Sequence, residues 1–228
     1  MKKLISALLL FLTSGFFSCA LCAEVTQKTR IAVLYFENNS RRAELAPLAK
    51  GLCDMMISAM AESAQIAVVE RTRLEEVLKE INLSNSKSFD QGTAAKIGKL
   101  LGAEYLVFGS FLELGTKFRI DARMVHVETG RICATAGVAG KADDFDEIER
   151  KVVDKLLLKL PSKGADAANK QSGGKAKVSV KTATKYGTAL DKIDSGDKKN
   201  ARKILSEVVA ENPDFTLAAN TLREISAD

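Results

Sequence analysis

Side chains that could carry out acid–base or nucleophilic chemistry are scarce in this sequence. The one histidine, His126, falls on the apolar side of a predicted strand, and no acidic or nucleophilic partner can be assigned to it. We interpret it as a core or rim residue, and a catalytic role stays open as the weaker alternative. No nucleophile elbow, zinc-protease motif or phosphate-binding loop occurs, since Gly98-Lys99 lacks a preceding glycine-rich loop. The sequence therefore predicts no catalytic residues, no cofactor and a protein that is not an enzyme.

Two groups of charged residues suggest a site at first, but each has a simpler interpretation. Asp143, Asp144 and Asp146 cluster where a helix should start, and carboxylates there interact favourably with the helix dipole without a bound cation. Glu70 and Arg71 follow a predicted strand and could be a functional pair, but we favour a solvated or strand-end ion pair. We therefore predict no metal site.

Two of the four cysteines, Cys53 and Cys133, lie in segments with the pattern of folded structure. Cys53 falls in an apolar helical segment and Cys133 in a predicted strand, so we expect two buried free thiols. A disulfide between them stays open, because sequence does not give the distance between the sulfurs. These segments hold no Cys-x-x-Cys pair, which argues against zinc and thioredoxin-type chemistry.

Residues 1–23 have the three parts of a secretory signal peptide: Lys2 and Lys3, then an apolar run, then small residues. The apolar run is shorter than the roughly 20 residues of a membrane-spanning helix, so a retained anchor is the lesser alternative. Lipidation at Cys19 is a further alternative, although only Ser18 of the three preceding residues fits the lipoprotein pattern. We expect a periplasmic protein that contacts the membrane only if Cys19 carries lipid.

Composition places the chain among ordinary globular proteins. Hydrophobic residues make up 46% and charged residues 28% of its 228 residues, enough for one full domain and a smaller module. The formal net charge is +5, and two of these charges belong to the predicted signal peptide. Such a mild excess of positive charge gives no reason to expect nucleic acid as a partner.

Apolar runs beyond the signal peptide alternate with helical patterns in the order of an α/β domain. The continuous apolar run from Ile31 to Leu34 suits a strand buried on both faces. Leucines and methionines then recur at helical spacing, which indicates an amphipathic helix. The predicted order is strand 30–37, helix 44–63, strand 66–69 and helices 73–81 and 93–102.

The period then changes to alternation. Phe118, Ile120 and Met124 alternate with charged residues, which gives one buried and one solvated face. Strands at 105–114, 118–127 and 131–139 are expected to form a meander with short turns, and a helix over 143–160 closes the domain. The predicted fold class is α/β (α+β), a mixed sheet flanked by helices with an antiparallel C-terminal meander, over residues 24–160.

Residues 161–181, rich in Lys, Ala, Gly and Ser, are predicted to be a flexible linker. Beyond it, 182–228 has helical patterns, and Ala189, Leu205 and Pro213 are among residues that fall at tetratricopeptide spacing. Stable arrays of that repeat need about three units, so an ordinary helical hairpin is an equal alternative. Either form of this small all-α module offers a surface to partner proteins.

An ordered series of phrases over about residues 30–158 resembles one protein family. The phrases are Ile31-Ala-Val-Leu-Tyr-Phe-Glu-Asn, Gly51-Leu-Cys-Asp-Met-Met-Ile-Ser-Ala, Val68-Val-Glu-Arg, Leu74-Glu-Glu-Val-Leu-Lys-Glu, Thr93-Ala-Ala-Lys-Ile-Gly-Lys-Leu-Leu-Gly-Ala-Glu-Tyr-Leu-Val-Phe-Gly-Ser and Val127-Glu-Thr-Gly-Arg-Ile. The series is similar to the CsgG family of curli production assembly/transport components. The resemblance implies an α/β domain at the outer membrane, which in curli-type members assembles into a ring with inserted hairpins.

From the resemblance and the missing catalytic groups we expect a non-enzymatic assembly or regulatory factor of the bacterial envelope. It would contact other envelope proteins through residues 182–228, and homo-oligomers are compatible with the family. A lipidated subunit of a curli-type secretion channel is one alternative, and an envelope hydrolase with an unrecognised site is another. The turn at 115–117 and the passage 139–146 leave no room for an added hairpin of membrane-spanning strands, which need about 9–11 residues each, so the channel is the second choice.

Overall fold

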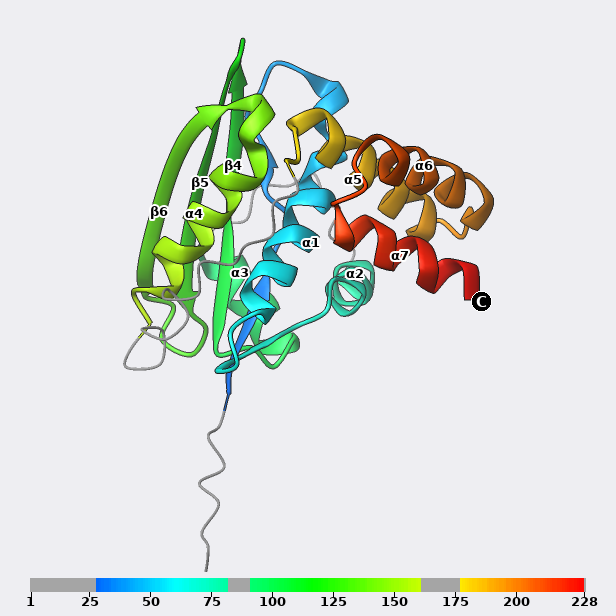
Figure 1. Cartoon of the computed structure of the whole chain (residues 1–228). Helices are drawn as coiled ribbons and strands as arrows, with labels where there is room; N and C mark the ends of the chain where they lie inside the picture. The colour runs from blue at the N-terminus through cyan, green and yellow to red at the C-terminus, as the bar shows by residue number, and fades with distance from the viewer. Residues whose placement is uncertain (1–27, 82–90, 161–176, 228) are drawn as a thin grey trace, which may run out of the picture.

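The computed structural model describes residues 28–81, 91–160 and 177–227 (Figure 1). The predicted signal peptide 1–23, with Cys19, lies outside the described residues, as does most of the predicted linker. Among the helices described, none is long and apolar enough to cross a membrane.

The centre of the fold is a mixed sheet with the strand order β3-β1-β4-β5-β6, and short β2 pairs with β4 beyond the end of β1. Neighbours β3, β1 and β4 run parallel, whereas β4, β5 and β6 form the antiparallel meander, so the predicted fold class is confirmed. The strands are β1 (Thr29–Val33), β2 (Glu37–Asn38), β3 (Ile66–Val68), β4 (Tyr105–Leu114), β5 (Lys117–His126) and β6 (Ile132–Lys141).

The strand predicted over 30–37 is divided into β1 and β2. Pairing with β4 is interrupted between Val33 and Glu37, although Leu34 still donates its N–H to the Val107 carbonyl at 2.8 Å. Every residue from Ile31 to Phe36 is no more than 2% exposed, so the run is covered on both faces as its uninterrupted apolar character predicts.

Helices cover both faces of the sheet. On one face, Phe145 of α4 packs edge-to-face on Phe118 of β5 at 5.3 Å, and the Cys53 thiol of α1 donates to the Val33 carbonyl at 3.3 Å. On the other face, α3 packs on β4 and β5, with Gly98 set against Val127. The helices of this part are α1 (Leu48–Ala61), α2 (Arg71–Glu80), α3 (Gln91–Leu100) and α4 (Phe145–Leu157), with short 3-10 turns at η1 (Ala43–Leu45) and η2 (Ala142–Asp144).

One prediction for the meander is wrong. Cys133 is exposed rather than buried. The register of β5 and β6 shifts between Met124 and Val125, so the start of β6 no longer follows the alternation of buried and exposed side chains. Cys53 is buried as expected, and both thiols are free.

Three helices follow the second gap: α5 (Val180–Asp194), α6 (Lys198–Glu211) and α7 (Thr216–Ala227). The last residues predicted as linker are ordered, because Val178 is 2% exposed and Ser179 caps α5 by accepting the Thr182 N–H at 3.1 Å. The helical hairpin is present, and its assignment as a tetratricopeptide unit stays a prediction.

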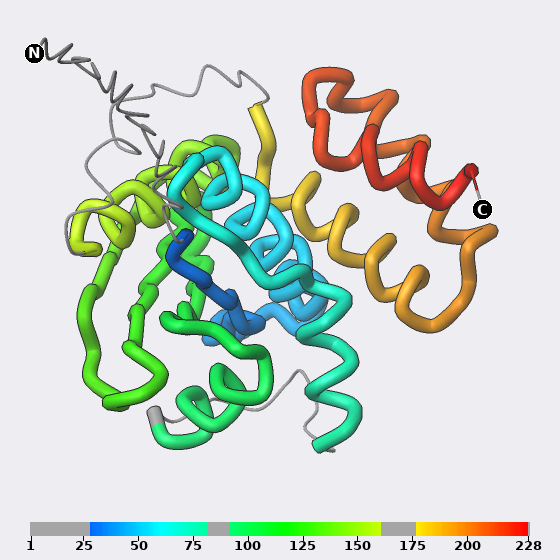
Figure 2. Tube along the Cα trace, turned by 90° about the horizontal axis from the view of Figure 1, so that it is seen from below, coloured from blue at the N-terminus to red at the C-terminus, as the bar shows by residue number. Residues whose placement is uncertain are grey.

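We had predicted a helical module joined to the sheet domain by a flexible tether, but the described helices are docked on that domain. Helix α5 lies along α1 on the side away from the sheet (Figure 2). The two backbones touch: a Cβ at Gly187 would lie 1.9 Å from the Pro47 carbonyl oxygen, and one at Gly51 would lie 2.5 Å from that of Ala183. Glycine at both positions lets the helices approach this closely.

Candidate functional site at the joint of α1, α2 and the C-terminal helices

The joint is built around buried ion pairs that join segments far apart in the sequence. Asp194, at the C-terminal end of α5, accepts hydrogen bonds from Arg71 Nη1 at 3.0 and 2.8 Å and from Lys50 Nζ at 2.7 Å. The side chains of Lys50 and Arg71 are 7% and 6% exposed. Lys50 comes from α1 and Arg71 from the first turn of α2, so one carboxylate connects three helices.

A second set of polar contacts surrounds this centre. The Tyr35 hydroxyl donates to Glu75 Oε2 at 2.6 Å, next to Lys50. The Tyr186 hydroxyl, on α5, donates to Asp54 Oδ2 at 2.6 Å and contacts Thr221 Oγ1 of α7 at 2.9 Å. The two hydroxyls thus extend the network from the segment between β1 and β2 to the last helix.

Burial and charge act in opposite directions on the groups of this cluster. Burial would raise the pKa of Asp194, but hydrogen bonds from Arg71 and Lys50 outweigh it and hold that pKa below its usual value. Burial would lower the pKa of Arg71, but the hydrogen bonds to Asp194 outweigh this effect and raise the Arg71 pKa. Desolvation raises the pKa of Asp54, with the hydrogen bond from Tyr186 opposing the rise.

The cluster has the chemistry of a structural joint. Its two cations are paired with carboxylates, and Cys53, which lies close by, is fully buried with its pKa raised by burial, so it is a poor nucleophile. Nor does any group of His, Cys, Asp and Glu in the described ranges have the arrangement of a metal site. What this arrangement can do is fix the orientation of α5, α6 and α7 on the sheet domain.

The residues singled out from sequence are placed as follows. His126 is half-buried at the end of β5, where its ring meets Tyr105 edge-on at 5.3 Å and Nδ1 accepts the Thr129 N–H at 3.3 Å. Asp146 lies in the first turn of α4, as the dipole interpretation requires. Arg71 contradicts our prediction of a solvated pair with Glu70, because it is 5% exposed and its partners are Asp194 and Asp54.

Sequence reasoning missed Lys50, Asp54 and Asp194. A usable sign was present in α1, which is apolar on nearly all sides: a helix that is apolar all round is covered on more than one side. One side of α1 packs on the sheet, and the opposite side meets α5.

A further buried ionisable group lies outside the joint. Glu149, on α4, is 2% exposed, and its Oε1 has no hydrogen-bond partner in the described part of the chain. Burial raises the pKa of Glu149 to about 8, with the nearby Arg150 opposing the rise.

Fold and joint together define a mixed α/β domain with a docked helical module and no evident catalytic constellation among the described residues. Residues 13–119 match the model of the family described as curli production assembly/transport component CsgG. The resemblance seen in the ordered phrases is thereby confirmed over just under half of the chain. The last phrase, from Val127, lies beyond the matched range.

Among curated proteins, the chain is 24% identical over 207 residues to a putative adenylate cyclase 3 of Rhizobium meliloti (strain 1021). The match covers 89% of this chain and 33% of that protein, so the chain spans about one third of the relative's length.

Two solved structures have a similar fold over about half of this chain. The C-terminal domain of LpoB from Salmonella enterica is 20% identical with a TM-score of 0.43, over 52% of this chain and 87% of that one. Lipoprotein GNA1162 from Neisseria meningitidis is 18% identical with a TM-score of 0.41, over 50% of this chain and 80% of that one. Both TM-scores are below 0.5, and our description of the fold therefore rests on the chain's own sheet topology.

Proposed function

We propose that this protein is a non-enzymatic assembly or regulatory factor of the bacterial envelope that acts through protein contacts. The match to the CsgG family and the secretory pattern of residues 1–23 support the location and the class of role. The single observation that carries the proposal is the joint, in which Lys50 and Arg71 of the sheet domain bind Asp194 at the end of α5. A pre-ordered helical surface loses little entropy on binding a partner.

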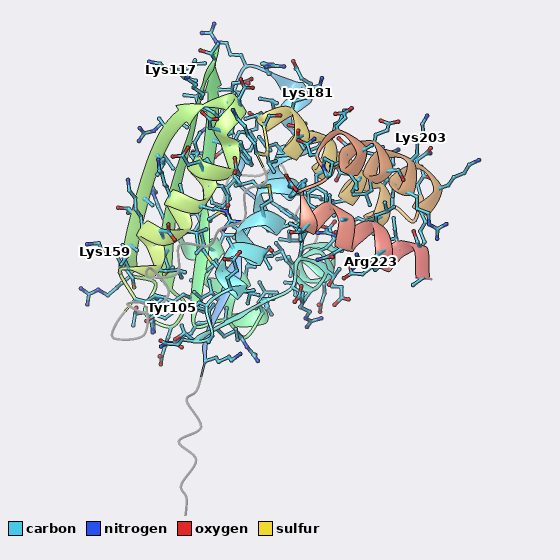
Figure 3. All side chains as sticks on the ribbon, in the orientation of Figure 1. Tyr105, Lys117, Lys159, Lys181, Lys203 and Arg223 are labelled. Atoms are coloured by element: carbon cyan, nitrogen blue, oxygen red, sulfur yellow. The ribbon has the colours of Figure 1, made fainter. Side chains whose placement is uncertain are left out.

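Helices α6 and α7 are the proposed contact surface, because α5 is occupied by α1. Lys203 on α6 and Arg223 on α7 are exposed, and both are labelled in Figure 3. Removing the whole module would uncover the buried charges Lys50 and Arg71, so point changes on α6 and α7 are the better probe.

Site-specific photo-crosslinking in cells tests the proposal. A photo-reactive residue at Lys203 or Glu207 of α6 should give a discrete crosslinked product with an envelope protein, and the same residue at exposed Lys96 of α3 is the matched control. Identical products from α6 and α3, or crosslinks to ribosomal and cytoplasmic proteins after fractionation, would count against the proposed role and location.

The alternative is a lipidated subunit of a curli-type secretion channel. It is ranked second because β4 and β5 are joined at Gly115-Thr116 and β6 is followed directly by η2. This alternative predicts palmitate labelling that is lost in Cys19→Ala, together with detergent-resistant rings. Absence of palmitate labelling would exclude the lipidated channel subunit.

Two catalytic alternatives are tested directly. Purified protein incubated with ATP and Mg²⁺ should form no cyclic AMP, which tests whether the activity named for the longer curated relative belongs to this region. An envelope hydrolase using His126 predicts an activity that is lost in His126→Ala. Either activity, abolished by substitution of one residue, would refute the non-enzymatic proposal.

A further inference from the structure

Strand β6 forms an open edge of the sheet. It is the last strand in the order β3-β1-β4-β5-β6, it is ten residues long, and no described element pairs with its outer side. In Figure 1 this edge lies on the side of the molecule opposite to α6 and α7. A long unpaired edge presents a row of N–H and C=O groups that can accept another strand.

The hydrogen bonds show which residues of β6 direct their backbone groups outward. Ala142, just after β6, donates its N–H to Thr116 on the β5 side, whereas the Gly137 carbonyl is contacted by Lys155 Nζ at 3.3 Å instead. Because N–H and C=O of alternate residues point to opposite sides of a strand, Thr135, Gly137 and Ala139 face the open edge.

Side chains leave this edge accessible. Thr135, Gly137 and Ala139 are small, and β6 contains no proline and only one charged residue, Lys141, at its end. Natural edge strands are usually blocked by proline, by several charges or by a covering element. Lys155 covers one carbonyl, and the neighbouring outward groups have no such cover in the described ranges.

Positively charged side chains lie next to the edge, on one face of the sheet. Lys117, Arg119 and Arg123 of β5 share the outer face of the sheet with Lys141 of β6. Lys117 and Lys141 lie directly opposite each other, an arrangement of like charges that destabilises a sheet unless an anion is present. Arg119 pairs with Asp121 at 2.6 Å, but in the described part of the chain Lys117, Arg123 and Lys141 form no ion pair.

We propose that β6 binds an extended, acidic segment of a partner protein by strand addition. Main-chain hydrogen bonds to Thr135, Gly137 and Ala139 would supply the binding, and carboxylates on one side of the added strand would meet Lys117, Arg123 and Lys141. A second copy of this chain fits less well, because a β6–β6 pair would place two positively charged sheet faces side by side and would add no carboxylates to pair with them. The proposal deepens the proposed function by naming a partner chemistry, and it concerns a surface separate from α6 and α7.

The test uses the purified full chain and a fluorescent ten-residue peptide of alternating Glu and Val. Fluorescence anisotropy should show binding that weakens with added salt, and a Lys-Val peptide of equal length should bind at least about tenfold more weakly. Ala139→Pro removes an outward N–H, whereas the β5 ladder uses the other set of amides, so this variant should fold and lose about tenfold in affinity. Arg123→Ala should weaken binding as well, with exposed Lys96→Ala as the matched charge control.

Wild-type protein gives a measurement that needs no variant. Addition of the Glu-Val peptide should slow amide hydrogen exchange at Thr135, Gly137 and Ala139, and a peptide with N-methylated amides should not. Equal binding to Ala139→Pro and wild type, or equal binding of the N-methylated peptide, would overturn strand addition. Binding to anionic vesicles without binding to the peptide would assign the cations to a membrane surface, and a dimer that Ala139→Pro dissociates would assign the edge to a second copy. Failure of this assay leaves crosslinking from α6 as an independent test of the proposed function.

Discussion

Asp194→Asn is the substitution that should most clearly separate the C-terminal helices from the sheet domain. The change keeps the shape of the side chain but removes the charge that faces both Lys50 and Arg71 at 2.7 and 2.8 Å. Removing one partner of a buried ion pair typically costs about 3–5 kcal/mol, because the other charge stays buried. Lys50 retains Asp191 at 2.8 Å, which is partly exposed, so we expect the lower end of that range.

A loss of about 3 kcal/mol corresponds to a drop of roughly 6–12 °C in melting temperature for a chain of this size. Differential scanning calorimetry and urea unfolding measure it. The pKa of Asp194 is lowered in the folded protein, so its contribution is present above the unfolded-state pKa of about 3.9 and is lost as pH falls through the folded value. The difference between wild type and Asp194→Asn should therefore narrow in acid.

Hydrogen exchange should show where the stability is lost. Amides of α5 should exchange faster in Asp194→Asn, while those of β4 and β5 should keep their protection. The control is Glu211→Gln, which removes the charge of an exposed pair with Lys185 and should leave unfolding unchanged. A loss below about 0.5 kcal/mol, or the same loss when Arg71 and Lys50 are already replaced by Met, would refute the reasoning.

Three further predictions concern the helix crossing, the buried glutamate and the thiols. Gly187→Ala should push α5 away from α1 and lower stability by about 1–3 kcal/mol in urea unfolding, whereas exposed Lys181→Ala on the same helix should not; unchanged stability would contradict the close contact at Pro47. Burial raises the Glu149 pKa to about 8, so the folded protein retains a proton that the unfolded chain loses above about pH 4.3, and stability should fall as pH rises between these values. Glu149→Gln should remove this pH-dependent fall in stability, whereas exposed Glu147→Gln should retain it. Identical profiles of stability against pH for wild type and both variants would disprove this prediction. Iodoacetamide should modify Cys133 in the native protein and Cys53 only after denaturation, as peptide mass mapping would reveal, and modification of native Cys53 would show that α1 opens.

Local sequence patterns were sufficient to predict most of the strands and helices. The strand Tyr105–Leu114 has the bounds that were predicted, and the helix stop at Gly102 is confirmed by its positive φ of 63°. The split of the first strand at Leu34 was not predictable, because a residue can leave the ladder and remain buried without any change in its apolar character.

Placement of charged residues was the weakest part of the sequence-based account. Arg71 was assigned to a solvated pair with its neighbour Glu70, yet its partner Asp194 is 123 residues away. Cys133 was expected to be buried, and a shift in register between β5 and β6 exposes it.

The sequence by itself determined the order of strands and helices, the family resemblance and the scarcity of catalytic groups, because hydrophobic periodicity and short phrases are local properties of the chain. Only the tertiary structure decided that the C-terminal helices dock on α1, that Asp194 joins Lys50 and Arg71, and that β6 is left as an open, positively flanked edge. The physical reason is that a charge, a glycine or an edge acquires its role from the partner that folding brings to it. Residues 50, 71 and 194 have no shared pattern until the helices that carry them are packed together.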